Sequence, residues 1–342
     1  MRGTMPTVVH RLKQILRRIG VTAPGTDPLS ESEFTQLVRL AQRVLWTKDR
    51  ELKRRIQAHD FQIVPSNFYS EIPTVEDVEN SFEYSDTQRG PFHSPEVFRP
   101  KVMDEFLDLM TPYAEEFRPP LEGDPKNPTG YFWNNPAFSY SDAMMYYCII
   151  RHVRPKKILE VGSGFSTLVA QEALRKNGEG SVTIIEPYPM EFLRGLSCVE
   201  RLIQKKVQDI PVDELVSEVE RADIWFIDST HTVKNGSDCL YLYLKVMPEI
   251  SRELYVHSHD IHLPFPFPET DLLERNVTWT EQYLLYAYLL DNPKAEVLFG
   301  SRYAAHFMGD ALARLMGDKY PGGGASFWYS IDGTQGHAGA RT

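Results

Sequence analysis

The chain has 342 residues, of which 42% are hydrophobic and 25% charged, as in an ordinary globular protein. Its 37 basic and 47 acidic side chains give a net charge of −10, which argues against a nucleic-acid-binding protein, because such proteins need a basic surface. We expect no membrane-spanning helix, since no run of about 18 apolar residues occurs. The cysteines Cys148, Cys198 and Cys239 are spaced for neither a disulfide framework nor a zinc site, and favour a reducing compartment such as the cytoplasm.

Residues 1–18 are rich in arginine and lysine and contain no acidic side chain. Apolar residues recur at helical spacing from Val8 to Ile19, but charges interrupt them, so a secretory signal peptide is not expected. One interpretation is a basic amphipathic helix that contacts a membrane surface or a partner. The other is a helix that packs on its own domain or on a second copy of the chain, which would give a homo-oligomer.

We expect four regions along the chain. Residues 1–60 are predicted to be helical, with Ser30 or Ser32 as the N-cap of a long amphipathic stretch. Residues 61–130 are rich in proline and aromatic residues, which suggests an ordered wrap or lid, with one helix near 100–117. Residues 131–332 form an α/β domain, and residues 333–342 form a flexible tail.

Short apolar runs alternate with helical stretches in the α/β domain. Strands are predicted at 156–162, 181–187, within 202–210, at 222–229, 253–261, 295–301 and 326–332. Helices are predicted after the first strand, around 190–200, at 236–250 and from Thr278, where Thr278 and Glu281 have the spacing of a capping box. The pattern predicts a Rossmann-like, doubly wound, mostly parallel seven-stranded sheet, with the ligand at the carboxyl ends of its strands.

The first strand ends in Glu160, Gly162, Ser163 and Gly164, followed by Ser166 and Thr167, either of which can cap the next helix. Glu186 lies at the end of the second strand, where a carboxylate suits the hydroxyls of a ribose. Together these residues predict a site for an adenosine-containing cofactor. A dinucleotide site would have a third glycine where Thr167 stands, and Glu160 would repel a pyrophosphate. Glu160 would instead suit a cationic cofactor such as S-adenosylmethionine, which carries a sulfonium and an ammonium group.

Polar residues also end the fourth and fifth strands. Asp228 and His231 follow one strand, and His259 and Asp260 follow the other, with His257 and His262 nearby. Because carboxyl ends of parallel strands share one edge of the sheet, we expect these side chains to meet.

The ordered series EVGSGFST (160–167), IIEP (184–187), Gln208-Asp209 and DIWFIDSTH (223–231) resembles the class I S-adenosylmethionine-dependent methyltransferases over about residues 131–331. The resemblance implies that Glu160, Gly162, Ser163 and Gly164 hold the methionine part of the cofactor. It implies that Glu186 holds the ribose and that Gln208 or Asp209 faces the adenine. Ser166 and Asp228 complete the expected cofactor set. The segment 132–147, with Phe138, Ser139 and Asp142, resembles the part that closes over the cofactor in small-molecule enzymes.

Three interpretations of the strand-end histidines remain open. His231 or His259 acts as a general base on a substrate hydroxyl, oriented by a carboxylate such as Asp260. Alternatively, Asp228, His259 and Asp260 bind a divalent metal, as in the metal-dependent O-methyltransferases that the sequence resembles. Mixed histidine and carboxylate ligands favour Mn²⁺, Zn²⁺ or Fe²⁺ over Mg²⁺. In the third interpretation, these residues only close off the strand ends.

The segments NFYSEIP (67–73), IHLPFPFPE (261–269) and WTEQYLLYAYL (279–289) resemble a branch of bacterial methyltransferases suspected of acting on sugars or secondary metabolites. The sequence therefore predicts a methyltransferase that modifies an oxygen, or as a less favoured alternative a nitrogen or carbon, of a small-molecule acceptor. The alternatives are an NAD-dependent oxidoreductase, a metal enzyme that does not transfer methyl groups, and a non-catalytic binding module.

Overall fold

The computed structural model describes residues 28–336, so the predicted basic N-terminal helix and the last residues of the predicted tail lie outside the described residues. The chain divides into two compact units. The first consists of the described residues up to Tyr84 together with Pro268–Thr278, and the second of Ser85–Phe267 with the described residues from Trp279 onward. The role of residues 61–130 as a wrap or lid stays a prediction.

The first unit is built from short helices. They are α2 (Glu31–Leu45), α3 (Arg50–Gln57), α4 (Val75–Glu79), a 3₁₀ turn (Phe82–Tyr84) and α10 (Glu269–Leu273). Ser30 is confirmed as the N-cap of α2, where it forms a capping box with Glu33. The helical stretch is interrupted after Leu45, because the Asp49 carboxylate accepts hydrogen bonds from the amides of Glu51 and Leu52 and starts α3.

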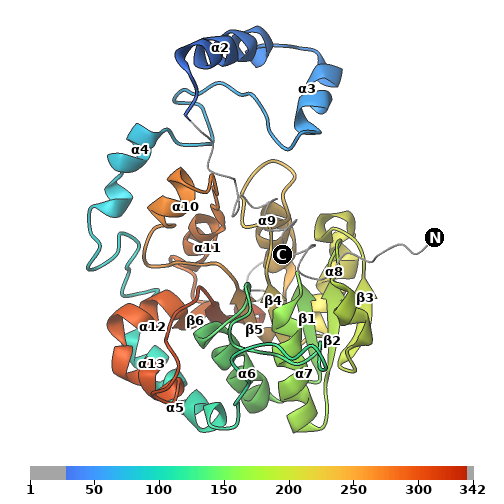
Figure 1. The fold of residues 1–342 in the computed structure, drawn as a ribbon. Coiled ribbons are helices and arrows are strands. Elements are labelled where there is room, and N and C mark those ends of the chain that lie inside the picture. The colour runs from blue at the N-terminus through green and yellow to red at the C-terminus, as the bar shows by residue number, and fades with distance from the viewer. Residues whose placement is uncertain (1–27, 337–342) are drawn as a thin grey trace, which may run out of the picture. The chain divides into compact units, whose positions relative to one another are not determined.

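The second unit contains the predicted seven-stranded sheet, in the order β3-β2-β1-β4-β5-β7-β6 (Figure 1). The strands are β1 (Lys157–Val161), β2 (Ser181–Ile185), β3 (Val199–Ile203), β4 (Ile224–Ile227), β5 (Glu253–Ser258), β6 (Ala295–Gly300) and β7 (Phe327–Asp332). Only β7 runs antiparallel to its neighbours β5 and β6. The strand order reverses between β1 and β4, and ligands bind at such a switch point in open α/β sheets.

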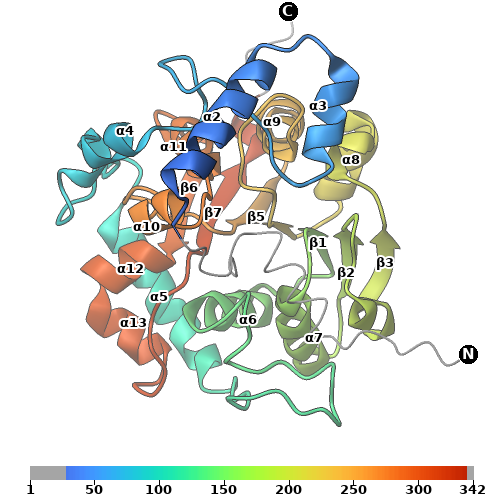
Figure 2. The same ribbon diagram turned by 45° about the horizontal axis from the view of Figure 1, so that its top comes forward.

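Helices cover both faces of this sheet, as Figure 2 shows for α6 and α7 on one face and α8 and α9 on the other. The first face carries α5 (Pro100–Ala114), α6 (Ser141–Val153) and α7 (Phe165–Asn177), with α12 (Ser301–Phe307) beside β6 and α13 (Gly309–Leu315) against α5. The second carries α8 (Val212–Glu220), α9 (Asp238–Tyr241), which continues as a π-helix (Leu242–Val246) and a 3₁₀ turn (Met247–Glu249), and α11 (Glu281–Leu289). Neighbouring strand residues enter opposite cores: Phe226 packs with the first layer and Trp225 with the second.

Three sequence predictions need correction. The third strand begins at Val199, earlier than predicted, and residues after Ile203 turn into a 3₁₀ segment (Val207–Asp209). This early start leaves room only for a 3₁₀ turn (Glu191–Gly195) where a helix was expected around 190–200. Helix α11 begins at Glu281 with Thr280 as N-cap, so Thr278 forms no capping box. Within residues 28–336, none of the helices is long and apolar enough to span a bilayer.

Candidate active site

The glycine loop, residues 162–164 between β1 and α7, lies at the switch point of the sheet. Gly162 has a φ of 79°, and a Cβ there would lie 2.1 Å from the carbonyl oxygen of Asp228, so glycine is needed for the loop to pack on the end of β4. At Gly164 a Cβ would meet only the side chain of Met190, 4.0 Å away. The hydroxyl oxygen of Ser163 is buried and has no hydrogen-bond partner among the described residues. An open backbone beside an unpaired buried hydroxyl fits a polar ligand held at this loop.

Glu160 is fully buried, and its predicted contact with a cationic cofactor stays a prediction. The hydroxyls of Tyr146 and Thr167 donate to its two carboxylate oxygens at 2.9 and 2.6 Å. Burial raises the pKa of Glu160 to about 7, although both hydrogen bonds oppose this shift. The residue fastens α6 and α7 to β1. Consequently Thr167 does not cap α7, whose N-cap is Gly164, and Ser166 is buried in its first turn.

The predicted cofactor residues outside the glycine loop differ in how far they are buried and in their hydrogen-bond partners. Glu186 is half-buried at the end of β2, accepts a hydrogen bond from the Tyr188 amide at 2.7 Å, and has a pKa raised by burial. Gln208 donates to the carbonyl of Gly236 at 3.4 Å, which links the segment after β3 to the loop after β4, whereas Asp209 is exposed. Ser139 donates to the Asn135 carbonyl within its own loop. Glu186 and Gln208 therefore remain candidates for the ribose and adenine sides of the site.

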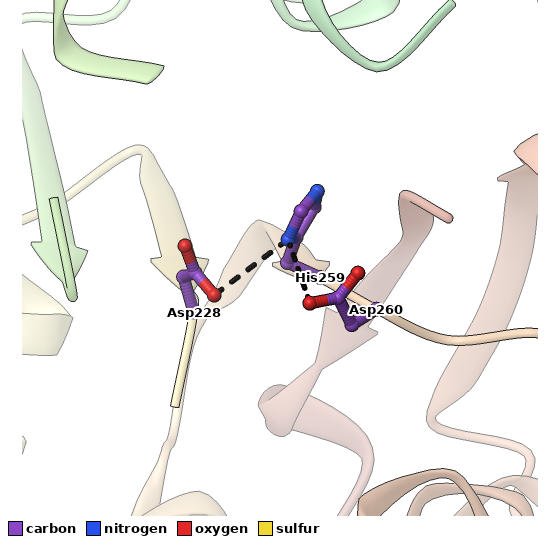
Figure 3. A group of neighbouring side chains, drawn as sticks. All are labelled: Asp228, His259 and Asp260. Atoms are coloured by element: carbon purple, nitrogen blue, oxygen red, sulfur yellow. Dashed lines mark ion pairs between the residues drawn. The ribbon is translucent and has the colours of Figure 1, made fainter. Parts of the chain in front are cut away.

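Asp228, His231, His259 and Asp260 meet at the ends of β4 and β5, and we call these four residues the histidine–carboxylate cluster. His259 Nδ1 lies 3.6 Å from Asp228 Oδ1 and 3.5 Å from Asp260 Oδ2, as Figure 3 shows. His231 Nε2 lies 3.2 and 3.4 Å from the same two oxygens. The potential ligand atoms of Asp228, His259 and Asp260 all lie within 4.8 Å of one another. The predicted convergence of both strand ends is confirmed.

Comparisons with known proteins agree with this arrangement. A family model described as a methyltransferase domain matches residues 159–261, which run from β1 to the residue after the cluster. A protein of Archaeoglobus fulgidus described as uncharacterized is 30% identical, and the match covers 43% of this chain and 69% of that protein. Residues 159–261 therefore form a methyltransferase domain.

Several solved methyltransferase structures are distantly similar to this methyltransferase. The O-methyltransferase TomG of Streptomyces achromogenes, solved with S-adenosylmethionine, is 12% identical, with 67% of this chain and 89% of that chain covered and a TM-score of 0.33. The methyltransferase PaMTH1 of Podospora anserina, solved with S-adenosylhomocysteine, is 12% identical, with 90% and 98% covered and a TM-score of 0.36. Scores this low do not bear on the acceptor or the mechanism.

Each histidine of the methyltransferase's cluster has a buried carboxylate on its far ring nitrogen. His231 Nδ1 lies 2.9 Å from Glu281 Oε2, and His259 Nε2 lies 3.4 Å from Asp142 Oδ2. Glu281 and Asp142 are only 2% and 4% exposed. The sequence analysis placed Asp142 in the segment over the cofactor and missed Glu281, which it assigned to a helix cap. The available signal was an acid at the start of a mostly apolar helix, EQYLLYAYL.

The surrounding carboxylates favour the protonated form of both imidazoles. Burial alone would lower the pKa of His231, but hydrogen bonds to Asp228 and Glu281 and the charge of Asp260 raise it to about 10. Burial also lowers the pKa of His259, but the charges of Asp260 and Asp228 outweigh this effect and raise the pKa well above its ordinary value. The surroundings of both rings therefore stabilise a bound proton.

The remaining histidines near the strand ends are core residues. His257 is fully buried, stacks on Phe226 at 4.0 Å between ring centroids, and pairs with the hydroxyl of Ser326. His262 is buried against Phe267, and burial lowers its pKa to about 3. By contrast, Trp279 is half-buried with its ring 4.6 Å from that of His231, so it forms an aromatic wall of the cluster.

Proposed function

We propose that this methyltransferase binds S-adenosylmethionine at the ends of β1 and β2 and transfers its methyl group to an oxygen of a small-molecule acceptor. The cofactor supplies an electrophilic methyl group on a sulfonium. Three features support its placement: the unpaired Ser163 hydroxyl, the open side of Gly164, and the half-buried carboxylate of Glu186. We assign the adenine side to Gln208 rather than Asp209, because Gln208 is half-buried and Asp209 is exposed.

The contact between Gly162 and Asp228 carries this proposal. The glycine loop packs directly on the Asp228 backbone, and the Asp228 side chain belongs to the histidine–carboxylate cluster. The loop that would hold the methyl donor and the groups that would prepare the acceptor therefore share one edge of the sheet. Placing two reactants in line is the main contribution that such a site makes to methyl transfer.

The acceptor hydroxyl must lose a proton, and the cluster offers two ways to achieve this. A neutral His231 or His259 would accept the proton as a general base. The surrounding carboxylates raise the pKa of both rings and favour their protonated form, which disfavours a free base unless another cation replaces these protons. If both imidazoles stay protonated, their positive charge would stabilise an acceptor oxygen, but neither ring could accept the proton of the hydroxyl.

The donor set favours the second way, a divalent metal held by Asp228, His259 and Asp260 with His231 beside them. Each histidine places one nitrogen near both aspartates and the other near a buried carboxylate, and this is how metal-binding histidines are oriented in proteins. When bound, the metal would lower the pKa of an acceptor hydroxyl. Two imidazoles with two carboxylates suit Mn²⁺, Fe²⁺ or Zn²⁺ better than Mg²⁺.

The proposal is tested by calorimetric titration of the full chain with S-adenosylmethionine and with NAD, each with and without Mn²⁺. We expect S-adenosylmethionine alone to bind. Glu186→Ala should weaken this binding about 10- to 100-fold, because a charge-assisted hydrogen bond contributes about 1.5–3 kcal/mol. Binding of NAD without S-adenosylmethionine would contradict the proposal and favour an oxidoreductase.

Methyl transfer itself is tested with S-adenosylmethionine carrying a labelled methyl group and a panel of sugars and phenols. We expect label only in compounds with a free hydroxyl, and less label after Mn²⁺ is removed by a chelator. Transfer to amines or carbon acceptors, with none to hydroxyls, would contradict the assignment to oxygen. Turnover that survives complete metal removal would contradict the metal route and restore the histidine as base.

A further inference from the structure

We propose that Glu281 is the positioning residue of the active site, and that the start of α11 fixes His231 so that its Nε2 faces the Asp228–Asp260 pair. The inference rests on the proposed function, since it concerns how the same cluster is aimed. Among the described residues, His231 is the member of the histidine–carboxylate cluster to which Glu281 is hydrogen-bonded.

The side chain of Glu281 is itself held rigidly. Its Oε2 accepts hydrogen bonds from the Ser229 hydroxyl at 2.6 Å and pairs with His231 Nδ1 at 2.9 Å, and its Oε1 accepts from the Tyr243 hydroxyl at 2.8 Å. Tyr243 in turn contacts the Ser258 hydroxyl at the end of β5. A buried carboxylate with three hydrogen-bonding groups around it cannot rotate without losing several bonds, so the imidazole that it holds is fixed as well.

The backbone of His231 is held by the same helix. The amides of Thr280 and Glu281 donate to the His231 carbonyl at 2.7 and 3.0 Å, and the Thr280 hydroxyl accepts from the amide of Val233. His231 adopts a φ of 58°, a left-handed conformation that is uncommon for a residue with a side chain. Such a conformation persists where the surroundings over-determine it, and here α11 supplies the contacts.

The combined geometry leaves one ring nitrogen for the active site. With Nδ1 engaged by Glu281, only Nε2 points to Asp228 and Asp260. His231 would therefore present the same nitrogen whether it binds a metal or contacts the acceptor. Glu281 lies 50 positions after His231 in the chain, so the pair exists only in the folded protein.

The test uses Glu281→Ala, with Tyr243→Phe as the matched control. Tyr243→Phe removes a partner of Glu281 from the same buried network but leaves the contact with His231. The probes are Mn²⁺ affinity by calorimetry and the Nδ1 proton of His231, observed by NMR in the metal-free chain labelled at histidine. We expect Glu281→Ala to lose this proton signal to solvent exchange and to weaken Mn²⁺ binding about 10- to 100-fold. Tyr243→Phe should keep the signal and bind Mn²⁺ within about twofold of the wild type.

The outcomes separate this inference from the proposed function. An unchanged His231 signal in Glu281→Ala, or an equal loss in Tyr243→Phe, would overturn the positioning role. If the wild type binds no Mn²⁺, the metal route fails and the NMR signal alone decides the role of Glu281. If Glu281→Ala does not fold, Glu281→Gln replaces it: the amide oxygen can still accept from Nδ1, so we expect the signal to remain at a shifted frequency. An unshifted signal in that variant would contradict the inference.

Discussion

The glycine loop and the histidine–carboxylate cluster adjoin at Asp228, yet they are built over very different distances along the chain. Glu160 and Thr167, which secure the loop, are seven positions apart. In the cluster, His231 is held by Glu281, 50 positions away, and His259 lies near Asp142, 117 positions away. The loop is thus a local motif of one strand and one helix, whereas the cluster depends on α6 and α11 docking correctly on the sheet. The following predictions test this difference.

The largest effect is expected at the contact between the two regions. Gly162→Ala would place a Cβ 2.1 Å from the Asp228 carbonyl at a positive φ, so both strain and a clash should appear. We expect a loss of about 3–5 kcal/mol in the free energy of unfolding, measured with urea. Gly178→Ala is the control, because Gly178 has a similar φ of 77° and nothing within 4 Å of the added Cβ. It should cost only about 1–2 kcal/mol. Equal costs would show that the contact with Asp228 does not constrain the loop.

Glu160→Gln should change how stability depends on pH. The pKa of Glu160 is raised to about 7 in the folded chain, against 4.5 ordinarily. The folded state therefore holds a proton that the unfolded state has lost between these values, so this contribution is present below pH 4.5 and disappears as pH rises through 7. Glu160→Gln removes this dependence, worth about 3 kcal/mol between pH 4 and 8. Urea titrations at both pH values check it, and identical pH slopes in the two proteins would contradict it.

Asp142→Asn should show that this carboxylate mainly fastens the protein. Asp142 accepts from the Ser301 hydroxyl and from the amides of Ala325 and Ser326 at 2.7–3.1 Å, while His259 is 3.4 Å away. An amide nitrogen in this place would face a donor, so we expect a loss of about 2 kcal/mol in the free energy of unfolding. Ser301→Ala, which deletes one donor, should cost about 1 kcal/mol. If Asp142→Asn leaves stability unchanged but abolishes Mn²⁺ binding, the main role of Asp142 is to orient His259 rather than to fasten the protein.

The smallest effect is expected for Ser163→Ala. The Ser163 hydroxyl has no partner among residues 28–336, so its removal should change the free energy of unfolding by less than about 0.5 kcal/mol. The affinity for S-adenosylmethionine should fall about 2- to 10-fold, as for loss of one neutral hydrogen bond. Calorimetry and urea unfolding measure both quantities. An unaltered affinity would mean that this hydroxyl does not face the cofactor.

The sequence predicted features that depend on local patterns, and it missed contacts between residues that are far apart in the chain. Apolar runs that alternate with helical stretches predicted six strands in place, but β3, which is only partly buried, was placed too late in the chain. The order of motifs predicted the methyltransferase domain. The sequence also predicted that Asp228, His231, His259 and Asp260 converge, since parallel strands end at one edge. It did not predict that Glu160 is fully buried with both carboxylate oxygens paired, because Tyr146 and Thr167 reach it from two helices. Nor did the sequence predict that Glu281 lies beside His231. The two residues are 50 positions apart, and no spacing in the sequence indicates that α11 docks next to His231.

The most direct test asks whether the methyl group of bound S-adenosylmethionine lies close to the histidine–carboxylate cluster. Mn²⁺ is added to the full chain with bound S-adenosylmethionine, and paramagnetic relaxation of the cofactor's protons is measured by NMR. We predict that the S-methyl protons relax faster than the adenine protons, and that this difference disappears in Asp228→Asn. If both ligands bind and the adenine protons relax faster, or none is affected, the glycine loop and the histidine–carboxylate cluster do not form one active site.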